Sequence, residues 1–520
     1  MSHSRDIEQA DASAVNAGAK AKVAATLYAA RVKIFPKDVH GFFRRLKWII
    51  MAVTLGIYYI TPWIRWDRWP NAPDQAVLLD LAHRRFYFFF IEIWPQEFYF
   101  VAGLLVMAGV GLFLVTSVVG RAWCGYACPQ TVWTDLFIAV ERFIEGDRNA
   151  RIKLDKASYG PRKIGLRVAK HAVWLLIAAA TGGAWIFYFA DAPGLARQLF
   201  TGTAPFIAYA TVGVLTFTTY TLGGLMREQV CIYMCPWPRI QAAMLDEDSL
   251  VVTYNDWRGE PRSRGVKKTK LEGVSAGDCI DCNACVAVCP MGIDIRHGQQ
   301  MECITCALCI DACDDVMGKL MRPTGLISYS TLRDYNHNMA LAAPDNGAIS
   351  PALIHKDDRS FVDGVRHFNW RVITRPRTLI YAGLWSLVGV GLVVALVTRD
   401  QLRLNVLHDR NPIAVKLSDG SVRNGYTIKL LNMQPEARTV TLAIDGLPGA
   451  QMSLAASQEQ LGRSMAVALE PDKLETLHLF VTVSPQLLKP GASPFQIRAS
   501  DFRLGSLAIY DATFDTEGVR

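Results

Sequence analysis

Five stretches of this chain are apolar enough to cross a lipid bilayer, which takes roughly 17 to 25 residues. They are residues 48–64, 98–120, 172–190, 204–225 and 379–397. A sixth apolar run, 86–95, is too short, contains Glu92 and is rich in the aromatic side chains that favour the membrane interface. We expect that run to be interfacial. Because 20% of all residues are charged, we expect the spans to be joined to soluble parts.

The basic residues predict how the spans are oriented. Lys and Arg number 9 before the first span, 10 between spans two and three, and 18 between spans four and five, against 4 and 1 in the other loops. By the positive-inside rule the N-terminus and the two basic loops are cytoplasmic, and the C-terminus is outside. The positive-inside rule fits least well at the outer loop that contains Arg65, Arg68, Arg84 and Arg85. The net charge of +8 is spread over loops without a nucleic-acid module, so we expect membrane lipid, and no nucleic acid, as a partner.

The spans divide the chain into predicted domains. Residues 1–46 lack an apolar signal-peptide core and predict a disordered cytoplasmic tail. Residues 47–226 hold four spans and the first of two related cysteine motifs. Residues 227–378 form a cytoplasmic loop with the second motif and a ferredoxin-like part at about 270–320, and residues 379–398 form the fifth span.

The segment after the last span has a different character. From about Pro412 onward, alternating runs such as YTIKLL, VTLAID, LHLFVTV and FQIRAS are separated by Gly, Pro, Asn and Asp. This pattern is typical of a small all-β sandwich, which we predict for residues 399–520 in the periplasm. The segment has no cysteine, so it needs no disulfide there. The predicted fold class is a five-span α-helical bundle with a ferredoxin-like insert and a C-terminal Ig-like sandwich.

Eight of the twelve cysteines form two runs with the spacing C-x2-C-x2-C-x3-C. In this spacing three cysteines bind one cubane cluster and the fourth reaches its neighbour. The rule predicts two [4Fe–4S] clusters, with the ligands Cys279, Cys282, Cys285 and Cys313 for the first and Cys303, Cys306, Cys309 and Cys289 for the second. The alternative is a pair of structural zinc sites, although zinc has no use for two interleaved runs.

Charged residues flank these runs. Pro290 follows the first run, but Asp314 stands where a proline would follow the second. Asp314 and Asp315 add negative charge that could lower a cluster's potential, yet we favour a solvated surface pair. The preceding segment RSRGVKKTK is expected to be a solvated linker near the anionic inner leaflet.

The other four cysteines form two C-x3-C-P motifs, Cys124 with Cys128 and Cys231 with Cys235. Each motif follows the cytoplasmic end of an outside-to-inside span, so spans one to two and three to four look like an internal repeat. If the chain is helical there, both thiols of a motif share one face, and two such faces make a four-thiolate site. That site could hold Cu(I) or a third iron–sulfur cluster. The alternative is that these are small buried packing residues.

Four further titratable residues are weaker candidates. His83 and His171 lie near opposite membrane boundaries and could be haem ligands or quinone contacts, but we favour interfacial or capping roles. Glu92 and Glu97 could relay protons from a quinol, but we expect them to be hydrated.

From Phe35 to the C-terminus, the chain closely resembles the cytochrome c oxidase accessory protein family known as CcoG, FixG or RdxA. The stretches that carry the resemblance are CGYACPQTVWTDLF, CIYMCPWPRIQAAMLDEDSLVVTYNDWRGEPR, CIDCNACVAVCPMGIDIRHG and CITCALCIDACDDVMGKLMRPTGLISYST. It implies a bacterial inner-membrane protein, ferredoxin ligands at the eight positions above, and a redox or copper role for Cys124, Cys128, Cys231 and Cys235. A weaker likeness extends to quinol-oxidising membrane subunits of periplasmic nitrate reductase systems.

The resemblance also implies a role in the biogenesis of cbb3-type haem–copper oxidase. The family is regarded as reducing Cu(II) to Cu(I), so copper ions and oxidase assembly factors or a copper transporter are the expected partners, with an unknown electron donor. Together with the topology, this predicts a cupric reductase that acts on the cytoplasmic face. Two other functions fit the same residues: a quinol-oxidising electron-transfer subunit, and a non-enzymatic copper scaffold whose sandwich docks the oxidase.

Overall fold

The computed structural model describes residues 33–68, 72–262, 277–343, 364–366, 370–434, 436–455, 457–501, 503 and 505–516. The tail predicted to be disordered, residues 1–46, lies mostly outside the described residues, which begin at residue 33. Most of the basic segment RSRGVKKTK also lies outside them. The chain forms two compact units. The first comprises residues 1–59, 109–186 and 204–382, and the second comprises residues 60–108, 187–203 and 383–520.

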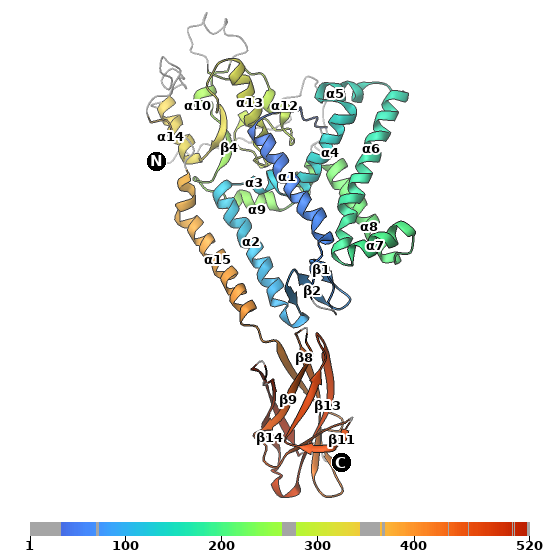
Figure 1. Cartoon of the computed structure of the whole chain (residues 1–520). Helices are drawn as coiled ribbons and strands as arrows, with labels where there is room; N and C mark the ends of the chain where they lie inside the picture. The colour runs from blue at the N-terminus through green and yellow to red at the C-terminus, as the bar shows by residue number, and fades with distance from the viewer. Residues whose placement is uncertain are drawn as a thin grey trace, which may run out of the picture. The chain divides into compact units, whose positions relative to one another are not determined.

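Five helical segments are long and apolar enough to cross a membrane, as predicted: Phe42–Trp63, Pro95–Val119, Pro161–Tyr188, Phe206–Met226 and Pro376–Val397. Their α-helical parts are α1 (Phe42–Ile60), α2 (Tyr99–Val119), α6 (Pro161–Gly182), α8 (Phe206–Thr219) and α15 (Pro376–Val397), labelled in Figure 1. The third segment begins well before its predicted start, because Pro161 opens the helix at N1 and a basic stretch precedes the apolar part. Hydropathy marks only the apolar part of such a helix.

Further helices in the first unit lie at or after the ends of spans two and four. They are α3 (Ala122–Tyr126), α4 (Pro129–Glu145), α5 (Arg148–Lys156), the π-helices η5 (Tyr220–Met226) and η6 (Val230–Met234), and α9 (Trp237–Met244). Helix α4 begins with Pro129 at N1 and ends before Gly146, whose φ of 86° stops the helix. Its buried face meets α6, where the rings of Phe137 and Trp174 are 5.4 Å apart.

The cysteine-rich insert is closed by a two-stranded antiparallel sheet of β4 (Val251–Tyr254) and β5 (Ile327–Ser330). Its other elements are α10 (Asp256–Gly259), α12 (Ala284–Val288), η7 (Ile295–His297), α13 (Leu308–Lys319) and α14 (Leu332–Ala342), followed by η10 (Trp370–Thr374). Helix α13 also anchors α1, because the Asp311 carboxylate accepts the backbone N–H groups of Phe43 at 3.2 Å and Arg44 at 2.7 Å. A carboxylate at these unpaired amides stabilises the start of α1.

In the second unit, the run predicted to be interfacial forms strands. A three-stranded sheet consists of β1 (Val77–Asp80), β2 (Arg85–Phe88) and β3 (Ile91–Ile93). Helices near the ends of the spans are η2 (Thr61–Trp63), η3 (Pro95–Glu97), η4 (Gly183–Tyr188) and α7 (Ala192–Thr201). The prediction that Glu92 and Glu97 are hydrated was wrong, since they are 6% and 0% exposed. Glu92 pairs with Arg85 at 3.2 Å and Glu97 with Arg399 at 3.4 Å, so arginines replace the expected water.

The C-terminal segment is a β-sandwich, as predicted. One sheet has the order β11-β10-β13-β8-β6, with β7 paired to β8, and the other has the order β12-β9-β14-β15. The strands are β6 (Leu402–His408), β7 (Val415–Lys416), β8 (Val422–Asn432), β9 (Arg438–Asp445), β10 (Gln451–Leu454), β11 (Ser457–Gly462), β12 (Ser464–Leu469), β13 (Leu474–Val483), β14 (Ala492–Asp501) and β15 (Ser506–Asp515), with η11 (Pro485–Leu487) before β14. The first strand of the sandwich starts at Leu402, three residues after the start of the predicted range 399–520.

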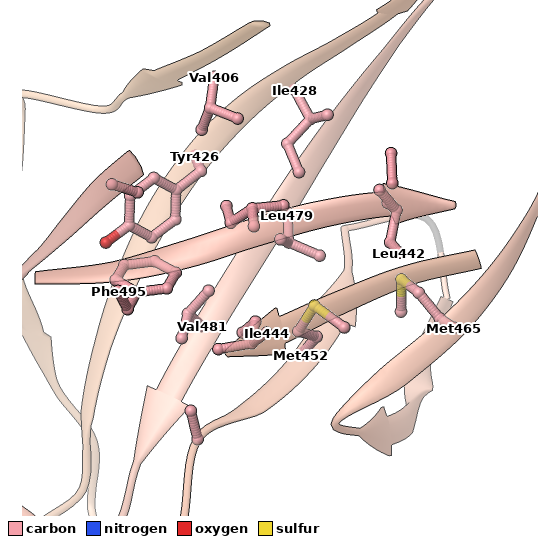
Figure 2. Close-up of a cluster of buried hydrophobic side chains, with 14 of the residues drawn as sticks. Val406, Tyr426, Ile428, Leu442, Ile444, Met452, Met465, Leu479, Val481 and Phe495 are labelled. Carbon is pink, nitrogen blue, oxygen red and sulfur yellow. The ribbon is translucent and has the colours of Figure 1, made fainter. Parts of the chain in front are cut away.

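The core of the sandwich is built from alternate residues of both sheets. Ile428 and Leu479 are completely buried, and the ring of Tyr426 meets that of Phe495 edge-on at 5.7 Å (Figure 2). The Tyr426 hydroxyl donates to the Thr513 carbonyl oxygen at 2.6 Å, so this buried polar group is satisfied. The domain thus has its own apolar core and needs no metal or disulfide to hold it.

Candidate metal centre

The eight ferredoxin-type cysteines line two adjoining cavities in the insert. One cavity is lined by Cys279, Cys282, Cys285 and Cys313, together with Tyr254 and Arg296. The other is lined by Cys289, Cys303, Cys306 and Cys309, and it also reaches Cys285. The last cysteine of each run therefore lies in the cavity of the other run, which is the crossed arrangement that the spacing predicts.

The backbone of the two runs repeats an unusual conformation. Asp281 and Asn283 in the first run have φ values of 53° and 58°, and Thr305 and Ala307 occupy the same places in the second run with 55° and 59°. These left-handed residues curl the chain so that successive cysteines face one cavity. Such a conformation costs about 1 to 3 kcal/mol at a residue with a side chain, and it persists where the surroundings or a function require it.

Polar contacts from two arginines hold the first run in place. Arg296 donates to the Asp281 carboxylate at 2.6 Å and to the Asn283 side-chain oxygen at 2.5 Å, which ties down both left-handed residues. Arg258 is 1% exposed and pairs with Asp278 at 2.5 Å, one residue before Cys279. These arginines also place positive charge beside the first cavity.

The two C-x3-C-P motifs are not continuous helices. Cys124 lies in α3, but Cys128 is the extended N-cap residue of α4, and Cys235 is likewise extended after the π-helix η6. The expectation that each pair shares one helical face was therefore wrong, because the proline after each second cysteine disfavours helical backbone at that cysteine. The two motifs also differ, since only the second contains π-helical turns.

The fold nevertheless places the four cysteines of these motifs in one neighbourhood, although among the described residues no three of them are placed to hold a single metal ion. The thiols of Cys128, Cys231 and Cys235 act electrostatically on Cys124, and those of Cys128 and Cys235 act on Cys231. Burial is the largest cause of raised pKa values here, to about 12 for Cys124 and about 11 for Cys231. Ionised thiols at this place therefore need a compensating cation, as metal ligation provides.

This four-cysteine group adjoins the second ferredoxin cavity. Gly125 lies against the second run so closely that a Cβ there would be 2.6 Å from the Ile304 carbonyl oxygen and 3.0 Å from the Cα of Cys306. The Tyr126 hydroxyl donates to the Cys306 carbonyl oxygen at 3.1 Å. No side chain fits between the two backbones at Gly125, so the two sites are in direct contact.

Arg121 connects these two sites electrostatically. It is 4% exposed, its guanidinium donates to the Met301 carbonyl oxygen at 2.6 Å, and its charge favours the ionised thiols of Cys124, Cys231 and Cys303. Sequence reasoning did not single it out. Its place directly after span two, three residues before Cys124, was the available signal.

Gln241 is a second residue that sequence reasoning missed. It is fully buried in α9, and its side-chain oxygen lies 3.0 Å from the Cys124 sulfur. Its amide nitrogen donates to the Thr116 hydroxyl oxygen at 3.1 Å, and that hydroxyl donates to the Leu112 carbonyl oxygen at 2.7 Å. Nothing in the spacing of the sequence pointed to a contact between residues 117 positions apart.

The donor set fits iron–sulfur clusters. Within the described ranges, no three His, Cys, Asp or Glu side chains are placed to hold a single metal ion. The eight ferredoxin-type cysteines instead stand around two cavities with apolar walls, and burial raises the pKa of Cys289 to about 12 and of Cys303 to about 11. Thiols in such cavities suit ligation of a polynuclear cluster.

The flanking charged residues lie as follows. Asp315 is exposed and pairs with Lys319 at 2.5 Å, as expected for a surface residue. Asp314 is half-buried, and it accepts the backbone N–H of Gly325 at 2.8 Å, so the expectation of a solvated pair was wrong for Asp314. His83 is exposed and bonds to Asp80 at 2.7 Å, whereas Nδ1 of His171 meets the Tyr220 hydroxyl at 2.9 Å.

Comparisons with known protein families agree with this geometry. Residues 226–332 match a family described as "4Fe-4S dicluster domain" and residues 100–145 match one described as "4Fe-4S binding domain". Residues 392–516 match "IG-like fold at C-terminal of FixG". Fold and site together define a membrane protein of the iron–sulfur electron-transfer class, with an Ig-like domain after its last span.

Full-length relatives identify the family. The chain is 64% identical to "Nitrogen fixation protein FixG" of Rhizobium meliloti, over 98% of this chain and 97% of that protein. It is 52% identical to "Protein RdxA" of Cereibacter sphaeroides, over 92% of this chain and 94% of that protein. "Protein RdxB" of the same organism is 54% identical over 85% and 90%. The chain belongs to the FixG family.

Proposed function

We propose that this protein reduces Cu(II) to Cu(I) at the paired C-x3-C-P motifs, on the cytoplasmic face of a bacterial inner membrane. One observation carries the proposal: the four cysteines of these motifs lie close enough to act on one another electrostatically, and Gly125 of the first motif lies against the backbone of Cys306 at the second ferredoxin cavity. The cation would be delivered for the copper centre of a cbb3-type oxidase. Oxidase assembly factors or a copper transporter would receive the product.

The eight ferredoxin-type cysteines would hold the cofactors, and the four cysteines of the C-x3-C-P motifs would bind the substrate. Cys279, Cys282, Cys285 and Cys313 would hold one [4Fe–4S] cluster, and Cys303, Cys306, Cys309 and Cys289 would hold the other. When bound, such clusters supply one-electron storage.

Copper is the substrate of the four cysteines in the C-x3-C-P motifs. Reduction of Cu(II) takes one electron, and soft thiolates bind Cu(I) better than Cu(II), which favours the product. Cys128, Cys231 and Cys235 are half-exposed, so an incoming ion can reach them, whereas Cys124 is buried. The charge of Arg121 favours the thiolate form of Cys124 and Cys231.

The test follows reoxidation of the dithionite-reduced protein by Cu(II) under anaerobic conditions. Cluster absorbance and a Cu(I)-specific chelator report the two products. Saturable oxidation that is lost when Cys124, Cys128, Cys231 and Cys235 are replaced by serine supports the proposal. Ile240→Ser, at an exposed position of α9 five residues after Cys235, is the matched control and should behave as wild type. Equal, unsaturable rates in all three proteins would mean that free copper simply oxidises the clusters.

The proposed orientation has its own test. A reporter that is active only in the periplasm, fused after residue 520, should be active, whereas the same reporter inserted between residues 262 and 277 should be inactive. The reverse result would place the cysteines outside and rule out cytoplasmic reduction.

A further inference from the structure

A separate cavity of about 270 Å³ lies between α4, α6 and the π-helix η5 in the first unit. Its walls include Phe35, Glu141, Lys170, His171, Leu225 and Arg227. One water molecule takes up about 30 Å³ of liquid, so this space can hold a substituted ring. None of the twelve cysteines lines it, so it is distinct from the metal sites.

The cavity lies where span three changes from polar to apolar. Upstream in α6 stand Arg162, Lys163, Arg167 and Lys170, and from Ala172 the helix is almost wholly apolar. His171 marks this boundary, and Leu225, at the end of span four, is an exposed apolar wall. Such a boundary belongs at the level of the lipid headgroups, so an amphiphile dissolved in the bilayer can reach the cavity.

The charges around the cavity are already paired with one another. Glu141 meets Arg227 at 2.7 Å, Arg151 at 3.1 Å and Lys170 at 3.3 Å, and Arg167 meets Glu145 at 3.2 Å. An anionic ligand would have to displace these buried carboxylates, which is costly. The lining therefore favours a neutral ligand that both donates and accepts hydrogen bonds.

The wall of the cavity includes a hydrogen-bonded histidine, His171, and part of a π-helix. The Tyr220 hydroxyl engages Nδ1 of His171 at 2.9 Å and so orients the ring, and a ligand would meet the other ring nitrogen. Tyr220 opens the π-helix η5, which ends at Met226, and the following residue, Arg227, has a φ of 43°. π-Helical turns occur frequently at functional sites.

Two residues connect this cavity to the cysteine site. Arg227 and Glu228 line the cavity, and they also line a smaller one that includes Cys231 and Pro290. The larger cavity thus shares two lining residues with the cavity that Cys231 lines. That placement suits a ligand that exchanges electrons with the cysteine-held centres.

We propose that this cavity binds the headgroup of a quinol, which is the electron donor of the protein; the donor role rests on the function proposed above. A quinol is neutral and membrane-soluble, and its two hydroxyl groups both donate and accept hydrogen bonds. Its oxidation breaks two O–H bonds and yields a quinone, two protons and two electrons. His171 takes one proton and Glu228 takes the other, and the two electrons would go one at a time to the clusters that the ferredoxin-type cysteines would hold.

The test uses the full-length protein in detergent, with duroquinol as a benzoquinol probe and menadiol as a naphthoquinol probe. Reduction is followed by the iron–sulfur absorbance under anaerobic conditions. His171→Phe removes the ring nitrogens, and Leu225→Trp fills the cavity from its apolar side. Each should raise the quinol concentration for half-maximal rate at least tenfold. Val214→Trp, at an exposed position of α8, is the matched control and should leave it unchanged.

Reoxidation by Cu(II) of dithionite-reduced samples separates the two proposals. Both variants should retain the wild-type rate, because neither residue belongs to the copper site. If neither quinol reduces the wild type while Cu(II) reoxidises it saturably, the cavity proposal is overturned and the copper proposal stands. Wild-type quinol kinetics in both variants would also overturn it. If quinol reduction follows the variants as expected but Cu(II) oxidation is unsaturable, the copper proposal fails and the quinol site stands.

Discussion

The side-chain oxygen of Gln241 lies 3.0 Å from the sulfur of Cys124, and the contact joins the helix after the second C-x3-C-P motif to the first motif. With a free thiol, the S–H group donates to this oxygen. A metal-bound thiolate can only accept, so the amide must rotate and present its N–H to the sulfur. The Thr116 hydroxyl can then donate to the amide oxygen once it gives up its hydrogen bond to the Leu112 carbonyl oxygen. Gln241 can thus serve both states of Cys124.

Gln241→Leu should therefore destabilise the protein and weaken metal retention at this motif. The substitution removes the acceptor of the buried Cys124 thiol and the amide that donates to the Thr116 hydroxyl oxygen, at a cost of about 1 to 3 kcal/mol. Thermal unfolding measures the first effect, and metal analysis after incubation with a chelator measures the second. Ile240→Leu, at the exposed neighbouring position, is the control. Unchanged metal retention in Gln241→Leu would show that the amide does not act on the ligand.

Arg121→Gln should lower the midpoint potential of the centre held by Cys303. The guanidinium is buried, and its positive charge stabilises the more negative reduced state. Cu(I) production should slow as well if the charge also supports Cys124. Redox titration monitored by electron paramagnetic resonance checks the potential, with Arg239→Gln, at an exposed position, as the control. A potential equal to that of wild type would show that Arg121 has only a structural role.

Cysteine substitutions should reveal the crossed pairing of the two runs. Cys313→Ser should affect the same cluster as Cys279→Ser, although the two positions are in different runs, because both line one cavity. Cys289→Ser should instead match Cys306→Ser. Each should remove up to about four iron atoms per chain, and the two pairs should leave different residual spectra. Matching spectra for Cys313→Ser and Cys306→Ser would contradict the crossed arrangement.

The stability of the small sheet in the second unit should fall as the pH rises through neutrality. Burial is the largest cause, and with nearby Asp472 it raises the pKa of Glu92 to about 7, although Arg85 and Arg399 oppose the shift. The folded state then binds a proton more tightly than the unfolded chain, whose carboxyl has a pKa near 4.5. Between these values, stability therefore decreases with increasing pH.

Hydrogen exchange of the amides in β2 and β3 measures this dependence. Protection should be greater at pH 5 than at pH 8 in the wild type, and Glu92→Gln should abolish most of the difference. A pH dependence that persists in the variant would assign it to another group.

Ile428→Ala should destabilise the sandwich by about 2 to 5 kcal/mol, because it removes a fully buried side chain from the core. The iron content should remain that of wild type, since the sandwich contains no cysteine. Limited proteolysis of residues 402–515 and iron analysis give the two readouts. Leu407→Ala, half-exposed on β6, is the control. A parallel loss of iron would mean that the sandwich supports the cysteine sites.

The features that could be predicted from the sequence are those with a local or periodic origin. The five spans follow from apolar length, the strands of the sandwich from alternation, and the grouping of the ferredoxin cysteines from a fixed spacing. The spacing of Cys289 and Cys313 even predicted which cavity each would line. Each of these patterns lies within a few tens of consecutive residues, so it can be recognised without knowledge of the tertiary structure.

The features that were missed depend on contacts between distant residues. Glu97 is fully buried because Arg399, some 300 positions away in the sequence, forms an ion pair with its carboxylate. The broken helices at Cys128 and Cys235 follow a local proline rule, but the π-helical turns beside them have no comparable signature in the sequence. The contact between Gly125 and Cys306 likewise depends on tertiary folding.

The exchange of terminal cysteines between the two runs has a consequence for the order of biogenesis. The first cavity is complete only when Cys313 has been synthesised, 34 positions after Cys279, and the second borrows Cys289 from the earlier run. A nascent chain that ends before residue 309 therefore lacks a full set of thiols for both cavities, and one that ends before residue 313 still lacks the set of the first cavity. Loading of both clusters must follow synthesis of Cys313, so the cysteines of the insert have to remain reduced until then.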